Sequence, residues 1–268
     1  MGKGRAQEIA QRLERMNNAR RYALPALLLL SLGAGLLFEL VLPVPDGLPA
    51  LLLREGAVRL CYAGAVCMLG AYAGLSLGSF GARPGRLGAL CLALSFAVAV
   101  NNLPISRLLS GAATVTAGGH AVLALALSCL ATALFEELLF RFFLLRLMLG
   151  RFGLSRRGRL AAVLLSSAVF GLSHLFNLAA GASPGATLLQ VGYSFLVGCL
   201  CAALCLLYGR LSLPVAFHAV YNFGGYLVPR LGQGPLYDAP TVVVTVLLAL
   251  ACGGCLLLAV FDRKNKIF

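Results

Sequence analysis

The sequence predicts an all-α membrane protein, a bundle of about eight transmembrane helices. Two observations lead to this fold class. Of the 268 residues, 60% are hydrophobic and only 12% are charged, whereas a soluble domain carries about 25% charged residues. The apolar residues also gather in runs of about 20, which is the length that a helix needs to cross a bilayer.

Eight such runs are separated by short polar or basic segments. They are expected at residues 23–43, 57–79, 87–106, 119–149, 160–182, 186–209, 211–229 and 241–261. Asn101, Asn102 and Pro104 interrupt the end of the third run. The first run is longer than the apolar part of a typical signal peptide, and LFELVLPVP offers no small-residue cleavage site, so it is expected to be a membrane span.

The distribution of positive charge predicts how these spans are oriented. With the N-terminus in the cytoplasm, Arg141 lies inside a span and four arginines lie on the far side: Arg54, Arg59, Arg107 and Arg230. All the other Lys and Arg residues then lie on the cytoplasmic side, as the positive-inside rule requires. An even number of spans also leaves both termini there, so we expect a multi-pass protein of the cell membrane.

The chain is expected to divide into a basic N-terminal segment, residues 1–22, and one membrane domain, residues 23–268. Ile9, Leu13 and Met16 share one helical face in the first segment. It is therefore either a short interfacial helix on anionic lipid or a basic tail that only fixes topology.

The net charge of +13 lies in short blocks between apolar runs, which argues against a nucleic-acid partner. The nine cysteines all lie in apolar runs, where they behave as small hydrophobes.

The fourth run contains charges that should not be in lipid. Glu136, Glu137 and Arg141 lie near the middle of LALALSCLATALFEELLFRFFLLRLML, although one charge at the bilayer centre costs at least about 2.5–3.5 kcal/mol. Glu137 and Arg141 are four residues apart, so they face the same way and can form an ion pair. Glu136 points elsewhere on the helix and is expected to face a cavity. Two adjacent carboxylates also resist joint ionisation, which suits a general base.

Polar side chains of two other runs lie at a similar depth. At 1.5 Å per residue, Glu136 and His174 are each about 20 Å from the cytoplasmic ends of their runs, and His218 and Asn222 about 12 and 18 Å. Each group alone has a structural explanation, such as a buried ion pair or a hydrogen bond between helices. Neither explanation accounts for Glu136 or for the shared depth. We therefore expect one shared cavity.

Three motifs on these runs resemble those of a known family. EELLFR, FGLSH and HAVYN are similar to the EExxxR, FxxxH and HxxxN motifs of the CPBP family, which comprises type II CAAX prenyl endopeptidases and bacteriocin-processing or Abi proteins. The resemblance covers about residues 119–229 and implies an intramembrane endopeptidase of the CAAX prenyl protease kind, a family often described as metalloproteases. It implies that Glu136 and His174 activate a water, that His218 and Asn222 hydrogen-bond the oxyanion, and that Glu137, Arg141 and Phe170 support them.

The resemblance leaves the cofactor open between none and zinc. If zinc is present, its ligands would be Glu136, His174 and His218, with one position left for water. The sequence has no HExxH motif, however, and Asn is a poor zinc ligand. A metal-free glutamate mechanism fits these residues at least as well.

The expected partners are the lipid bilayer and a membrane-embedded or lipidated substrate. That substrate is either a prenylated CAAX protein or a bacteriocin-like peptide. The alternative function is a catalytically silent membrane scaffold or a bacteriocin-immunity protein that binds a partner through the same cavity. A transporter would instead show inverted repeats in the two halves of the chain, and the buried polar residues occur only in the second half.

Overall fold

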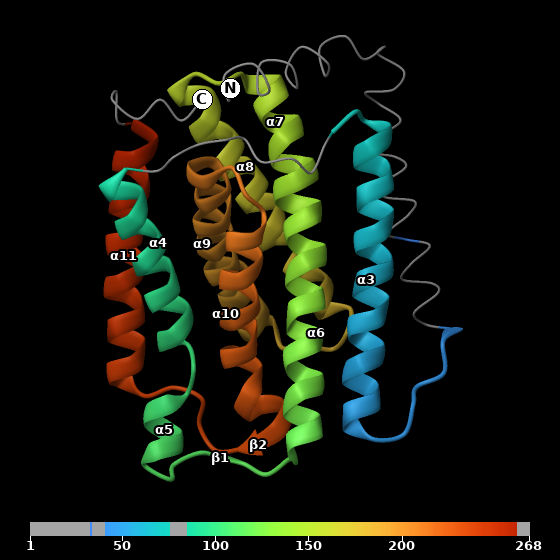
Figure 1. Ribbon diagram of the computed structural model, residues 1–268. Coiled ribbons are helices and arrows are strands. Elements are labelled where there is room, and N and C mark those ends of the chain that lie inside the picture. The colour runs from blue at the N-terminus through green and yellow to red at the C-terminus, as the bar shows by residue number, and fades with distance from the viewer. Residues whose placement is uncertain (1–32, 34–40, 76–84, 262–268) are drawn as a thin grey trace.

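The computed structural model describes residue 33, residues 41–75 and residues 85–261. The predicted span at 23–43 and the N-terminal segment 1–22 therefore lie outside the described residues, apart from residues 33 and 41–43 of the span. The described part is a bundle of upright helices joined by short loops (Figure 1). Its helices and strands are α3 (Leu48–Tyr72), α4 (Arg86–Asn101), α5 (Ile105–Leu109), β1 (Thr114–Val115), α6 (Gly119–Glu137), η1 (Leu138–Leu144), α7 (Leu145–Phe152), α8 (Arg156–Ser173), η2 (His174–Leu178), α9 (Pro184–Tyr208), α10 (Ser212–Leu231), β2 (Gly232–Gln233) and α11 (Ala239–Phe261).

The all-α membrane fold is confirmed, but the count of eight helices is not. Seven helical segments stand where spans two to eight were predicted. Within the described ranges, four are long and apolar enough to cross a membrane, and a shorter apolar stretch occupies Ala239–Gly254. The four are Arg86–Leu109, Gly119–Phe152, Arg156–Leu178 and Pro184–Tyr208.

The predicted bounds of the second span, 57–79, were wrong. Helix α3 begins at Leu48, with Pro49 in its first turn, and ends at Tyr72. Proline is favoured at a helix start because its missing N–H would have no partner there. The prediction began too late because Arg54 and Glu55 suggested a loop. In the folded chain the Glu55 carboxylate pairs with Arg230, so these charges fit within the helix.

Close packing at glycine fixes how α3 and α6 lie against each other. A Cβ on Gly56 would lie 3.3 Å from the Cα of Ser128, and a Cβ on Gly70 would collide with the ring of Phe142. Both pairs differ by 72 in residue number, so the two helices run parallel and in register. Figure 1 shows them side by side, both rising from the end that carries β1 and β2.

The loops of that end are tied together by backbone pairing. Strands β1 and β2 are antiparallel, with Thr114 opposite Gln233 and Val115 opposite Gly232. They join the loop before α6 to the end of α10, far apart in the sequence. The starts of α6 and α3 and the end of α10 therefore form one end of the bundle (Figure 1).

Two of the helices that line the site, α8 and α9, start with side-chain caps. Ser155 accepts a hydrogen bond from the Gly158 N–H at the start of α8, and this satisfies a backbone donor that has no partner within the helix. Helix α9 starts with the same arrangement at the β1–β2 end, where Ser183 precedes Pro184. These caps fix where α8 and α9 begin, and so the depth at which their polar residues lie.

Candidate active site

The two glutamates are the last residues of α6, and the chain continues directly as the π-helix η1. A π-helical turn is wider than an α-helical turn and frequently occurs at functional sites. Arg141 lies within η1, and its guanidinium Nη1 is 3.1 Å from the Glu137 Oε1 atom. The i, i+4 spacing of the sequence therefore does produce an ion pair, although the intervening backbone is not an α-helix.

Glu137 and Arg141 are shut away from solvent. Their side chains are 0% and 1% exposed. Arg141 also donates a hydrogen bond from Nη2 to the Gly198 carbonyl of α9 at 3.0 Å, and its guanidinium lies 4.7 Å from the centroid of the Phe170 ring. A buried ion pair is stable only when such further hydrogen bonds and stacking offset the loss of water. The pair thus fastens η1 to α8 and α9.

His218 connects this buried pair to Glu136. Its Nδ1 lies 2.8 Å from Glu137 Oε1, and its Nε2 lies 3.4 Å from Glu136 Oε2. A carboxylate accepts only, so Nδ1 carries a proton and donates it to Glu137. At Nε2, a lone pair and a carboxylate would repel each other. A proton therefore has to lie on Nε2 or on Glu136 for this approach to be favourable.

His174 is oriented by its own helix. It follows the last residue of α8 and begins η2, and its Nδ1–H donates to the Phe170 carbonyl at 3.1 Å. Because a carbonyl cannot donate, this bond leaves Nε2 unprotonated in the neutral ring, 3.5 Å from the Ser194 hydroxyl. The Phe170 ring packs edge-on against both histidines, with centroids 5.2 Å from His174 and 5.7 Å from His218. Phe170 thus sets the positions of both imidazoles.

Glu136 borders two adjoining cavities of about 230 and 200 Å³. Its side chain is 21% exposed, unlike that of Glu137. The residues that line both cavities are Thr132, Glu136, His174, Gln190, Asn222 and Tyr226. The smaller cavity also touches His218 and Phe170. The cavities together hold the volume of a small peptide segment.

The larger cavity extends toward the end of the bundle that carries β1 and β2. Its outer lining contains Glu55, Arg59 and Arg230, which we call the mouth. Glu55 and Arg59 belong to the first half of α3, and Arg230 is the penultimate residue of α10. Figure 1 shows these parts at the end of the bundle opposite α7. The mouth therefore opens away from the α7–α8 and α9–α10 loops.

The residues of this site fall within a recognisable domain. Residues 118–224 match the family model of the Rce1-like type II CAAX prenyl endopeptidases. The chain carries an Rce1-like domain. The family resemblance predicted from the three motifs is thereby confirmed, and the match runs from the start of α6 into α10. No curated protein and no solved structure matches the chain.

The structure brings most of the predicted site residues of the Rce1-like domain together. Glu136, His174 and Asn222 share the cavity lining, and His218 is within 3.4 Å of Glu136. Glu137, Arg141 and Phe170 lie behind them, bonded or packed as described above. Their roles in a reaction stay predictions.

Helix α9 adds polar residues that the sequence reasoning missed. Gln190 and Ser194 line the smaller cavity, and the Gln190 side chain accepts a 2.8 Å hydrogen bond from Asn177. Their spacing of four residues in an otherwise apolar span was the available signal, because it places both on one helical face. Asn177, three residues after His174, belongs to the same wall. Helix α9 thus lines the cavities together with the three segments that carry the motifs, and α3 adds Glu55 and Arg59.

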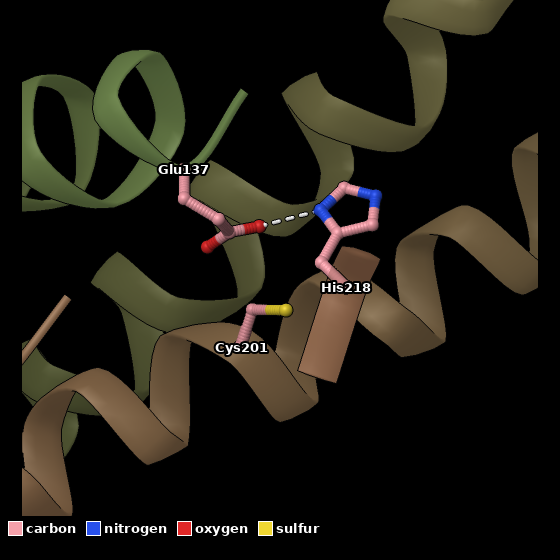
Figure 2. Close-up of side chains that lie close together, drawn as sticks. All are labelled: Glu137, Cys201 and His218. Atoms are coloured by element: carbon pink, nitrogen blue, oxygen red, sulfur yellow. Dashed lines mark hydrogen bonds and ion pairs between the residues drawn. The ribbon is translucent and has the colours of Figure 1, made fainter. Parts of the chain in front are cut away.

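Cys201, also on α9, forms a cluster with Glu137 and His218 (Figure 2). One ligand atom from each residue lies within 4.8 Å of the others. Among the residues that the structure describes, this is the group whose spacing could hold a metal ion. The zinc ligands considered above were instead Glu136, His174 and His218. The cluster of Figure 2 fits a metal poorly, because Glu137 Oε1 already accepts a hydrogen bond from His218 Nδ1 and the Arg141 guanidinium, a fixed positive charge, lies 3.1 Å away.

Proposed function

We propose that this protein is an intramembrane endopeptidase that hydrolyses a peptide bond of a membrane-associated substrate. The observation that carries the proposal is the shared cavity: an accessible carboxylate, Glu136, lies in it with the imidazole of His174 and the amide of Asn222. The cavity belongs to a domain whose family is named for endopeptidases. Hydrolysis needs a base beside a water and donors aimed at the developing oxyanion, and this wall offers both.

In the proposed reaction, Glu136 and the unprotonated Nε2 of His174 hold and activate a water. The water oxygen forms a bond to the peptide carbonyl carbon while its proton passes to Glu136. The carbonyl oxygen becomes an oxyanion. When the C–N bond breaks, Glu136 returns the proton to the departing amine, so no atom or charge is left over.

His218 and Asn222 are proposed to stabilise the oxyanion. The Asn222 amide donates from α10, and His218 donates from Nε2 once that atom carries a proton. The hydrogen bond from Nδ1 to buried Glu137 at 2.8 Å holds the imidazole so that Nε2 faces Glu136. Donors of this kind are each worth about 10²–10³-fold in rate.

This mechanism uses no metal ion. The cluster of Figure 2 does not argue for one, since its carboxylate, Glu137, is already paired with Arg141. The proposal therefore predicts that cleavage continues after treatment with a strong zinc chelator, with a zinc peptidase as the control that must lose activity.

The orientation of the chain bears on the kind of substrate. We propose that both termini lie in the cytoplasm of a cell-membrane protein, as the arginine distribution favours. The mouth then opens on the opposite face, where Arg54, Arg59, Arg107 and Arg230 lie. A prenylated protein made in the cytoplasm would have to reach the cavity from the other side. This orientation therefore favours a lipidated or membrane-spanning peptide presented on the outer face.

The proposal is tested by comparing the terminal peptides of membrane proteins from cells that express the wild type or Glu136→Gln at equal, folded levels. Asp46→Asn is the matched control, because it makes the same chemical change at an exposed loop position. New termini that appear with the wild type and with Asp46→Asn, but not with Glu136→Gln, are expected. They would also name the substrates.

Identical terminal profiles in all three strains would contradict an endopeptidase. That result would favour the second function, a silent scaffold or immunity protein that binds its partner through the same cavity.

A further inference from the structure

We infer that Asn102 and Tyr237 are positioning residues for Asn222, the residue proposed to hydrogen-bond the oxyanion. The inference rests on the proposed function and adds two residues to it. Both lie outside residues 118–224, the Rce1-like domain. Asn102 is also one of the residues that interrupt the third apolar run, and the mechanism described above gives it no task.

Asn102 is a buried amide that binds helix α10. It follows the last residue of α4, and only 3% of it is exposed. Its Nδ2 donates a hydrogen bond to the backbone carbonyl of Tyr221 at 2.7 Å. Because a carbonyl can only accept, this bond fixes which end of the amide faces α10. The Oδ1 atom is then left to accept a hydrogen bond from another part of the chain.

The backbone of Asn102 touches the same turn of α10 at a second point. A Cβ on Gly224 would lie 2.7 Å from the Asn102 carbonyl oxygen, so only glycine lets the two backbones come this close. Tyr221 and Gly224 lie immediately before and shortly after Asn222 in α10. Asn102 therefore holds the helix on both sides of Asn222. Since the backbone sets the direction of a helical side chain, it also holds the Asn222 amide.

Tyr237 fixes the other end of the Asn102 amide. Its hydroxyl donates a hydrogen bond to Asn102 Oδ1 at 2.8 Å. The loop that carries Tyr237 is tied in turn to α5: the Tyr237 carbonyl accepts a hydrogen bond from Arg107 Nη2 at 3.1 Å. The next residue, Asp238, accepts one from the Ser106 hydroxyl at 2.9 Å and pairs with Arg107 at 3.8 Å. The phenol is therefore held in place independently of α10.

The pair stands at the cavity wall, beside the residue that it holds. The smaller cavity is lined by Asn102, Tyr221, Asn222 and Tyr237, among others. A donor stabilises an oxyanion only when it is aimed at the place where the charge develops, and a displacement of about 1 Å can cost about 10²-fold in rate. His218, the other proposed donor, is held by Glu137. Asn102 and Tyr237 do the same for Asn222.

The first test needs no substrate. The purified full-length protein is labelled with ¹⁵N-asparagine, and the side-chain amide signals of its seven asparagines are recorded by NMR. Asn222→Ala identifies the Asn222 signals. Tyr237→Phe removes only the hydroxyl that binds Asn102, and it should shift the Asn222 signals. Tyr208→Phe makes the same change at the end of α9, at the other end of the bundle (Figure 1), and should leave them unchanged.

The second test measures turnover of the substrate that is identified by its Glu136-dependent terminus. Tyr237→Phe should lower kcat by about 3–10-fold, the effect of one hydrogen bond, and leave KM nearly unchanged. A tyrosine that only contacted the substrate would change KM instead. Asn102→Ala should lower kcat by about 10–100-fold. Asn101→Ala is its matched control, because the adjacent Asn101 binds Thr245 of α11, and it should keep the wild-type kcat.

The sharpest comparison places Tyr237→Phe in the Asn222→Ala background. If Tyr237 acts through Asn222, the double variant should have the kcat of Asn222→Ala alone, because the effects of coupled residues are not additive. The same fold-loss of kcat in both backgrounds would overturn the inference.

The two tests separate this inference from the proposed function. Unchanged Asn222 signals in Tyr237→Phe would overturn the positioning role, whether or not the protein cleaves a substrate. Shifted signals in a protein for which no Glu136-dependent terminus is found would overturn the endopeptidase and support the positioning role. Tyr237→Phe removes a single oxygen atom, so it decides the outcome even if Asn102→Ala does not fold.

Discussion

Two adjacent glutamates, Glu136 and Glu137, experience opposite environments. Glu137 is fully buried and bound by Arg141 and His218. Glu136 is 21% exposed and borders both cavities. We call the first region the closed cluster (Glu137, Arg141, Cys201) and the second the open cavity (Glu136, His174, Asn222). The ring of His218 joins them, with one nitrogen toward each carboxylate.

The difference shows how one helix end supplies both structure and a reactive group. A carboxylate that is buried and bound by neighbouring side chains contributes to the stability of the fold, but it is poorly placed to exchange a proton with substrate. A carboxylate beside a cavity can do so, provided that something holds it in place. In this chain the closed cluster holds His218, and His218 holds Glu136. Substitutions in the two regions should therefore have separable effects on turnover and on stability.

His218→Ala should have the largest effect, because it removes the residue shared by both regions. Glu137 loses a 2.8 Å partner, and a buried group left unsatisfied costs about 1–3 kcal/mol of stability. The oxyanion loses one donor, so kcat should fall by about 10²-fold or more. Turnover and thermal unfolding are both measured, the latter with a thiol-reactive dye on the nine cysteines. Loss of only one of the two would show that His218 does not link the regions.

Asn222→Ala should act on the open cavity alone. We expect kcat to fall by about 10²–10³-fold with little change in unfolding temperature. Asn101→Ala is the contrasting control. Its amide donates to the Thr245 hydroxyl of α11 at 2.7 Å, so this variant should lose stability and keep its turnover. If the two variants changed turnover and unfolding temperature in the same way, the separation between residues of the open cavity and residues that only stabilise the fold would be contradicted.

Arg141→Lys should act on the closed cluster alone. Lysine keeps the charge but cannot reproduce the hydrogen bond to the Gly198 carbonyl and the stacking on Phe170. A loss of about 1–3 kcal/mol in the free energy of unfolding is expected. The same change at exposed Arg210 should leave unfolding unaffected. An unchanged unfolding temperature for Arg141→Lys would mean that the cluster does not fasten η1 to α9.

Asp238→Asn should have the smallest effect, a slight change in unfolding temperature. Asp238 lies outside both regions, in the loop before α11. Hydrogen bonds from Thr241, and then from Ser106, lower the pKa of its carboxyl from 3.8 to about 2. Its carboxylate form is therefore favoured by folding. The contribution to stability is complete above about pH 4 and is lost as the pH falls toward 2. The unfolding temperatures of the wild type and Asp238→Asn should differ slightly at neutral pH and converge at pH 2. A constant difference would contradict this account.

Features that depend on local spacing could be predicted from the sequence. The apolar runs locate seven of the helical segments, and the Glu137–Arg141 pair follows from a separation of four residues. The convergence of Glu136, His174 and Asn222 follows from their equal depth in neighbouring spans.

Features that depend on residues distant in the sequence could not be predicted. Arg54 and Glu55 suggested a loop, because the ion pair that admits Glu55 to α3 comes from Arg230, 175 residues later. The π-helix after Glu137 leaves no distinctive spacing in the sequence. Cys201 looked like any other apolar residue of α9, and only the packing of α9 against η1 brings it to Glu137.

The most direct test compares Glu136→Gln with Glu137→Gln in purified protein, with turnover of an identified substrate and unfolding temperature measured side by side. Glu136→Gln should abolish most turnover, by at least about 10²-fold, and leave the unfolding temperature near that of the wild type. Glu137→Gln should lower stability by about 3–5 kcal/mol, because it leaves the buried Arg141 without its counter-charge. Normal turnover by Glu136→Gln, or wild-type stability of Glu137→Gln, would contradict the division between an open, reactive carboxylate and a closed, structural one.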